Sequence, residues 1–263
     1  MNNLTNSTTR LMQLTDTHLF GDPGRSLRGV ATLPALRQTL AAARAGIEAC
    51  HAILATGDLV QDDPAGYAHF RAEFGALGKP VLCIPGNHDD VPAMRAALAQ
   101  APFDLSPVHD LGAWRLVQLD SSVPREVAGR IKPADLALLD DALAGAGARH
   151  VLVALHHHPI PMGSAWLDTI GLVNAAEFFA VLDRHGPVRA VLFGHVHQAF
   201  DGERRGVRLL GTPSTCSQFR PRSDHFAIDE RPPAWRALQL HANGSIDTQL
   251  GWLEPQQAAR LHA

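Results

Sequence analysis

The sequence predicts an α/β sandwich in which two sheets are flanked by helices. Two observations lead to this fold class. From residue 10 to residue 193, short apolar runs of strand length alternate with segments whose apolar residues recur at helical spacing. After Gly194 the pattern changes to short segments in which apolar and polar residues alternate, which is typical of antiparallel strands. Such a succession is characteristic of helices packed on the outer faces of sheets.

The first half of the chain contains three strand-like runs separated by helical patterns. Strands are expected in the apolar runs 10–15, 52–56 and 80–84. One helix is expected to be capped by Thr32 and to continue through Ile47, because its apolar residues recur at helical spacing. A second helix is expected after Pro64, a residue suited to a first helical turn, and a third helix from about 91 to 100.

The second half continues this alternation and then becomes rich in strands. Strands are expected in 108–120, 150–155 and 188–193, followed by antiparallel strands in 207–210, 235–241 and 246–252. One helix is expected to begin at Pro133, and another, capped by Asn174, follows the long loop 156–172. Residues 214–233 contain three prolines and are expected to form an irregular, cap-like excursion.

Length and composition indicate one globular domain. The 263 residues are enough for one large core, and no linker-like segment divides them. We expect a disordered lead-in at 1–9, a single domain over 10–253 and a tail at 254–263. The hydrophobic fraction of 46% and the charged fraction of 19% are those of an ordinary globular protein. The net charge of −3 and the lack of a basic run argue against nucleic acid as a partner.

Cysteine usage and the N-terminal residues indicate a location. Cys50, Cys83 and Cys216 are far apart and form no C-x-x-C pair, so a reducing compartment fits better than a disulfide framework. Residues 1–9 lack the basic and apolar regions of a signal peptide. No apolar run approaches the roughly 20 residues of a membrane span. We therefore expect a cytoplasmic protein without a membrane partner, and the sequence leaves both a monomer and a homodimer open.

Five polar stretches each follow a short apolar run, where a strand is expected to end. They are Asp16-Thr17-His18, Gly57-Asp58, Gly86-Asn87-His88-Asp89, His156-His157-His158-Pro159 and Gly194-His195-Val196-His197. Strands of one sheet that end at the same edge would bring these loops together. Taken singly, each stretch is also compatible with a turn, a surface histidine or a packed core residue. The five in order instead predict a metal site built from carboxylate, imidazole and amide groups.

The order of these motifs resembles that of the calcineurin-like metallophosphoesterase superfamily, from about Leu11 to Trp252. Within it, the chain resembles the bacterial 3′,5′-cyclic AMP phosphodiesterases. The narrower resemblance rests on five segments: residues 15–20, 55–59, 155–159, 164–168 and 212–216. The resemblance implies a single metallophosphoesterase domain over 10–253, folded as a four-layer α-β-β-α sandwich of two mixed sheets flanked by helices.

The resemblance also implies a site for two divalent or trivalent metal ions. The ligands implied by similarity are Asp16, His18, Asp58 and His197 for the first metal, and Asn87, His156 and His195 for the second. Asp58 would bridge the two metals. His156 is matched to the family ligand because it directly follows the apolar strand, which leaves His157 and His158 behind the ligands or in the pocket. Oxygen and imidazole ligands admit several metals, with iron expected first and manganese or zinc as alternatives.

The resemblance directs His88 toward the substrate, because its neighbour Asn87 is taken by a metal. His88 would either protonate the departing 3′-oxygen as a general acid or contact a phosphate oxygen; alternatively, it only fixes the turn. In related phosphatases an acid three residues after the bridging aspartate partners this histidine, whereas here that position is Gln61, followed by Asp62 and Asp63. The residues expected to meet the substrate are His18, Asp58, Asn87, His88 and His197.

Recognition of the base is left open by the sequence. Aromatic and basic side chains near the excursion would either cover the pocket or pack within a cap: Trp166, Phe219, Arg220, Arg222 and His225. The segment Ser214-Thr215-Cys216 either shapes a base pocket or simply ends a strand.

The function implied by the resemblance is hydrolysis of a small-molecule cyclic nucleotide, 3′,5′-cyclic AMP, to 5′-AMP by a metal-activated hydroxide. One alternative is a broader phosphodiesterase that acts on other cyclic nucleotides or on glycerophosphodiesters. Another, of a different class, is a non-catalytic metal-binding regulator. The complete set of candidate ligands together with His88 argues against a regulator, because a scaffold has no need of them all.

Overall fold

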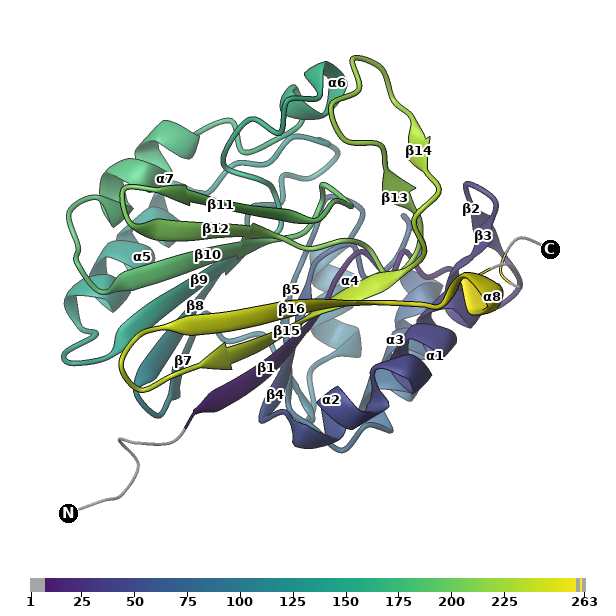
Figure 1. The fold of residues 1–263 in the computed structure, drawn as a ribbon, viewed down its shortest axis with the longest axis horizontal. Helices are drawn as coiled ribbons and strands as arrows, with labels where there is room; N and C mark the ends of the chain where they lie inside the picture. The colour runs from purple at the N-terminus through teal and green to yellow at the C-terminus, as the bar shows by residue number, and fades with distance from the viewer. Residues whose placement is uncertain (1–7, 259–260, 262–263) are drawn as a thin grey trace.

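The apolar runs build two six-stranded mixed sheets in the computed structural model, which describes residues 8–258 and 261 (Figure 1). The sheets lie face to face, and helices cover both outer faces. The predicted α/β fold class, with two mixed sheets flanked by helices, is therefore confirmed. None of the helices in the described residues is long and apolar enough to cross a membrane.

The first sheet has the strand order β16-β15-β1-β4-β5-β6. Its strands are β1 (Thr9–Leu14), β4 (Ala52–Thr56), β5 (Val81–Ile84), β6 (Phe103–Asp104), β15 (Ala234–Leu240) and β16 (Ile246–Trp252). The strands from β1 to β6 run parallel, and β15 returns antiparallel beside β1. The chain therefore closes the first sheet with its last two strands.

The second sheet has the strand order β11-β12-β10-β9-β8-β7. Its strands are β7 (Val108–Leu111), β8 (Trp114–Leu119), β9 (His150–Leu155), β10 (Val188–Phe193), β11 (Phe200–Arg204) and β12 (Val207–Gly211). The strands β8, β9, β10 and β12 run parallel. Residues 207–210 were expected to form an antiparallel strand. This is correct for the pairing of β12 with β11, but β12 runs parallel to its other neighbour, β10. The turn through Arg205 and Gly206, both with positive φ, folds β12 back so that it runs in the direction of β10.

Alternating side chains explain the layers. Along β9, Leu152 and Ala154 face the core between the sheets, whereas Val151, Val153 and Leu155 face the helices. The helices over the first sheet are α1 (Thr32–Ala42), α2 (Arg44–Ala49), α3 (Tyr67–Gly75) and α4 (Val91–Ala97), and those over the second are α5 (Pro133–Ala144) and α7 (Ala175–Leu182). Because both faces of the central strands are covered, these strands read as continuous apolar runs.

Smaller elements lie around the ends of the strands. They are the hairpin of β2 (Ser26–Leu27) and β3 (Val30–Ala31), the short helix α6 (Ala165–Asp168), the pair β13 (Gln218–Phe219) and β14 (Ile228–Asp229), and α8 (Pro255–Ala258). Figure 1 shows α6 beside the excursion that carries β13 and β14.

Two predicted helix starts are corrected by the structure. The helix expected from Thr32 to Ile47 is divided at Ala43 into α1 and α2. Thr32 is its first residue rather than its cap, because β3 runs directly into the helix and leaves Ala31 at the cap position. Asn174 does precede α7, but its side chain bonds to the backbone N–H and carbonyl of Ile131 instead of capping the helix.

The predicted boundaries also change. Thr9 already belongs to β1, so the lead-in expected over 1–9 ends earlier; residues 1–7 lie outside the described residues. The tail expected at 254–263 contains α8 and Leu261, which is 1% exposed and packs near Leu253; residues 259–260 and 262–263 lie outside the described part. Residues 214–217 are buried, so the exposed excursion starts only after them.

Candidate metal centre

The five polar stretches converge at one end of both sheets. Each follows the carboxyl end of a parallel strand: β1, β4 and β5 in the first sheet, and β9 and β10 in the second. Backbone bonds join the first two loops, since Asp16 N–H donates to Gly57 O at 3.0 Å and His18 N–H to Asp58 O at 2.9 Å. The carboxyl edge of parallel strands is where α/β folds place ligands.

One group of candidate ligands combines residues from opposite sheets. Nε2 of His197 lies 3.2 Å from Oδ1 of Asp16 and 3.1 Å from Nε2 of His18. The ring of His197 is held by its Nδ1–H, which donates to Ser217 O at 2.6 Å. This bond leaves the Nε2 lone pair of His197 directed at the Asp16 carboxylate, an arrangement that favours a cation between them.

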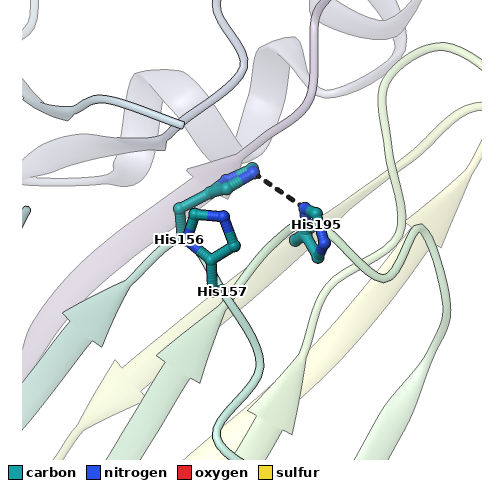
Figure 2. Close-up of side chains that lie close together, drawn as sticks. All are labelled: His156, His157 and His195. Atoms are coloured by element: carbon teal, nitrogen blue, oxygen red, sulfur yellow. Dashed lines mark hydrogen bonds between the residues drawn. The ribbon is translucent and has the colours of Figure 1, made fainter. Parts of the chain in front are cut away.

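A second group lies around Asp58. Its Oδ2 lies 3.3 Å from Nε2 of His156, and Nε2 of His156 lies 3.3 Å from Nδ1 of His195 (Figure 2). Nδ1–H of His156 donates to Thr56 O at 2.9 Å, which directs Nε2 toward Asp58. The same Oδ2 of Asp58 lies 3.8 Å from Nε2 of His18. Asp58 therefore stands between the two groups.

His157 lies beside His156 and His195 but faces other partners (Figure 2). Its Nδ1 lies 2.8 Å from the hydroxyl of Ser121, and its Nε2 lies 3.1 Å from Val127 O. Both ring nitrogens are thus engaged by the loop after β8. His158 is buried at 2% exposure and its ring stacks on that of His195.

The backbone of the site is held in the left-handed region. Positive φ values are found at Asp16 (56°), His18 (47°), Asp58 (51°), His195 (65°) and His197 (47°). This conformation costs roughly 1–2 kcal/mol for a residue with a Cβ, and such strain concentrates at functional sites. Its occurrence at five of the seven candidate ligands indicates that the loops are shaped to aim these side chains rather than for backbone stability.

Two glycines make room for the ligands. A Cβ at Gly86 would fall on Oδ1 of Asp58, and a Cβ at Gly57 would fall on the ring of His156. The loops after β4, β5 and β9 can approach one another only because these positions lack side chains.

The protonation of the site suits a cation. Burial would raise the pKa of Asp58, but His156 beside it brings the pKa well below its usual range; in the same way, His197 lowers that of Asp16. Burial would lower the pKa of His156, but Asp58 raises it to about 9. Burial lowers the pKa of His18 to about 3 and that of His195 well below its usual value. Ionised carboxylates and neutral imidazoles are the forms that bind metals, so these carboxylates and the rings of His18 and His195 are in the binding form, whereas His156 must release its proton to bind.

Unpaired buried atoms support the same conclusion. Oδ1 of Asn87, Nδ1 of His18 and Nε2 of His195 are buried without a hydrogen-bond partner among the residues that the structure describes. Leaving such an atom unsatisfied costs roughly 1–3 kcal/mol. A carbonyl oxygen in this state, next to carboxylates and imidazoles, fits a bound cation. The residues present therefore fit the expected metals.

His88 is placed differently from the candidate ligands. Its backbone N–H donates to Oδ1 of Asp58 at 2.9 Å, whereas its half-exposed ring faces Asp62, with Nδ1 3.0 Å from Oδ2. The Gln61 amide nitrogen lies 2.8 Å from the same ring nitrogen. An acid thus partners His88 although Gln61 occupies the family position. Asp62 reaches back because its own backbone is left-handed, with φ of 53°.

The aromatic side chains near the excursion pack on one another. Trp166 meets both Phe219 and Phe226 edge-on, with ring centroids 5.2 and 5.1 Å apart. Phe219 stacks on His197, with centroids 4.1 Å apart and an angle of 4° between the planes. Phe226, which sequence reasoning did not include, is thus a third member of this aromatic cluster. In the sequence, the only feature that pointed to Phe226 was its position within the excursion at 214–233.

The other residues expected near the base lie in two kinds of surroundings. Arg220, Arg222 and His225 are exposed. Ser214, Thr215 and Cys216 are buried, and the hydroxyl of Ser214 donates to Asp16 O at 2.7 Å. This segment therefore supports the loop of Asp16 and His18.

Comparisons with known proteins agree with this geometry. Residues 9–199 match the family model described as calcineurin-like phosphoesterase. The chain is 41% identical over 243 residues to a 3′,5′-cyclic adenosine monophosphate phosphodiesterase CpdA of Escherichia coli K12, covering 92% of this chain and 88% of that protein. It is 40% identical over 245 residues to the protein of the same name in Pseudomonas aeruginosa, covering 93% and 90%. A dimetal phosphatase from Danio rerio shares the fold, with a TM-score of 0.61 and 15% identity over 91% of this chain and 98% of that one.

Proposed function

The chain belongs to the calcineurin-like phosphoesterase family, and we propose that it hydrolyses 3′,5′-cyclic AMP to 5′-AMP at a site for two metal ions. The observation that carries this proposal is the position of Asp58. Its Oδ2 lies 3.8 Å from Nε2 of His18 and 3.3 Å from Nε2 of His156. A carboxylate between two groups of imidazoles is suited to bridge a pair of metals.

The ligand assignment follows the two groups. Asp16, His18, Asp58 and His197 would hold one ion, and Asp58, Asn87, His156 and His195 the other. Oxygen and imidazole donors admit iron, manganese and zinc. When bound, such ions lower the pKa of water and neutralise charge on a phosphate. Without them, Asp16 and Asp58 would repel a phosphodiester anion, so this site requires cations to accept its substrate.

The phosphate would lie over side chains of the loops that follow the carboxyl ends of the strands. They are His18, Asp58, Asn87, His88 and His197. Hydrolysis breaks the bond between phosphorus and O3′, adds the oxygen of water to phosphorus and places a proton on O3′. Asp62 holds Nδ1 of His88, so Nε2 of that ring is the atom available to deliver this proton as a general acid. The product that retains the 5′ ester is 5′-AMP.

The test is hydrolysis of 3′,5′-cyclic AMP by the purified protein after loading with Mn²⁺ or Fe²⁺, with the products separated by chromatography. We expect 5′-AMP, and a chelator should abolish its release. Release of 3′-AMP alone would contradict the assignment of O3′ as the leaving group. Absence of turnover with either metal would instead favour a non-catalytic regulator, and equal turnover of glycerophosphodiesters in the same assay would favour the broader phosphodiesterase.

A further inference from the structure

A pocket of about 410 Å³ opens beside His88, and none of its lining residues belongs to the aromatic cluster of Trp166, Phe219 and Phe226. It lies between the segment from Asn87 to Pro92, which joins β5 to α4, and the loop Ser122–Arg125 after β8. Its volume falls within the roughly 300–1,000 Å³ of pockets that take small organic molecules. None of the expected metal ligands except Asn87 lines it.

The walls of this pocket combine aliphatic side chains with polar and charged groups, several of which are engaged by the protein. Pro64, Val91, Pro92, Val123 and Pro124 supply aliphatic surface on its sides. Of its three carboxylates, Asp62 is engaged by His88, Asp89 accepts from the backbone N–H of Gly86 at 2.9 Å and from Tyr67 Oη at 2.8 Å, and Asp90 accepts from the backbone N–H of Ala93 at 2.9 Å. Arg125 is the one arginine or lysine among the lining residues, and it is exposed. A flat heterocycle fits such walls, because aliphatic side chains cover its faces and a guanidinium can stack on it.

The aromatic cluster offers less room for a base. Phe219 has one face stacked on His197, 4.1 Å between centroids. Phe226 meets Phe219 edge-on and is covered by the guanidinium of Arg28, 4.0 Å from its ring centroid. Trp166 packs its ring against both. One face of Phe219 is therefore covered by His197, and Trp166 packs against both phenylalanines, whereas Phe226 remains 41% exposed. Packing within a cap is the better account of this cluster.

Chemistry selects the same pocket. The proton placed on O3′ comes from His88 in the proposed function, on which this inference rests, so the ribose must lie on the His88 side of the phosphate. His88 itself lines the pocket. We propose that the ribose and base of the cyclic nucleotide occupy this pocket, with the base between Pro92 and the loop Val123–Arg125. Residues of this pocket, and not the aromatic cluster, then distinguish a nucleotide from a simple phosphodiester.

The experiment measures how products inhibit hydrolysis of methyl 4-nitrophenyl phosphate, a small diester without a nucleoside, by the Mn²⁺-loaded protein. Inhibition constants are compared for 5′-AMP and inorganic phosphate. We expect 5′-AMP to bind at least tenfold more tightly than phosphate to the wild type. Val123→Trp, which fills the pocket, should weaken 5′-AMP at least tenfold and leave the phosphate constant within twofold. Val123→Ala, which only removes wall contacts, should weaken 5′-AMP several-fold.

Val127→Trp is the matched control, because Val127 lies in the same loop, is 48% exposed and does not line the pocket. It should leave both constants unchanged. Equal inhibition of the wild type by 5′-AMP and phosphate, or unchanged 5′-AMP binding in Val123→Trp, would overturn the inference. Loss of 5′-AMP binding in Phe226→Ala would overturn it in favour of the aromatic cluster. Because this assay does not use cyclic AMP, failure of the proposed function appears separately, as absence of cyclic AMP turnover.

Discussion

Replacing His88 by alanine separates its two proposed roles, proton donor and phosphate contact. The substitution should leave the metal ligands in place. It is the backbone N–H of His88, not its ring, that holds Asp58, at 2.9 Å from Oδ1. Nδ1 of the ring lies next to Asp62 and Gln61, which are not candidate ligands. His88→Ala therefore removes none of the seven assigned ligands, although a ligand atom of this ring lies within 4.8 Å of those of His18 and Asp58.

The size of the effect depends on the leaving group. The 3′-oxygen of ribose leaves as a poor alkoxide, and general acid catalysis is worth about 10²–10⁴-fold for such a step, or about 2.7–5.4 kcal/mol. A 4-nitrophenolate leaves without a proton, so its loss should stay below about tenfold. A phosphate contact would instead contribute about the same 1.5–3 kcal/mol to both substrates. The ratio of the two losses thus identifies the role.

The assay compares kcat with cyclic AMP and with methyl 4-nitrophenyl phosphate for wild type and His88→Ala, with metal content measured on the same preparations. We expect a loss at least tenfold larger for cyclic AMP, at unchanged metal content. Equal losses for the two substrates would refute the acid role and leave a phosphate contact. Loss of metal would show that the ring only supports the turn. Asp62→Asn should also lower kcat more for cyclic AMP than for methyl 4-nitrophenyl phosphate, but by a smaller factor than His88→Ala. The reason is that Asp62 orients the ring of His88 and does not itself donate to the substrate.

Three further predictions concern the metal ligands. Gly86→Ala should lower turnover about 100-fold, because its Cβ must displace Asp58 by an ångström-scale shift. Gly186→Ala is the control and should have no effect, because a Cβ at that position meets open space. Equal turnover of the two variants would contradict the role of Gly86. In the metal-free protein the pKa of His156 is about 9, so below that pH Mn²⁺ must displace its proton and binding should weaken as the pH falls. Calorimetry at pH 7 in two buffers should detect about one proton released per chain, and none would refute the pairing with Asp58. His156→Gln should lose metal, whereas His157→Gln should retain it, because both ring nitrogens of His157 contact other groups. Loss of metal in His157→Gln alone would show that His157, and not His156, is the ligand.

The positions of the five loops could be predicted in part from strand order. Parallel strands of one sheet end at the same edge, which brings together the loops after β1, β4 and β5 in the first sheet and those after β9 and β10 in the second. The sequence pointed to one sheet, and only the fold shows two sheets that place these edges at the same end. The core strands were equally readable, since 52–56 and 150–155 are continuous apolar runs buried on both faces. These features depend on local pattern and on a rule of topology, and both are present in one sequence.

Features that depend on single backbone conformations were not predictable. Asp62 reaches His88 through a left-handed φ, whereas residue spacing pointed to Gln61. Asn174 has the residue type of a cap, but the neighbouring loop at Ile131 competes for its side chain. The direction of β12 depends on the turn at Arg205 and Gly206. The alternation of apolar and polar residues does not show how this turn folds. The pocket beside His88 joins residues 62–64, 87–92 and 122–125, which are separate along the chain, and only the folded chain shows it.

We propose that Asp58 is shared by two metal ions held by loops from both sheets. Metal content per chain tests it most directly, measured by mass spectrometry after loading with Mn²⁺ and removal of free ions. We expect two ions in the wild type, one in His195→Ala and less than one in Asp58→Ala. One ion in the wild type, or two in Asp58→Ala, would contradict it.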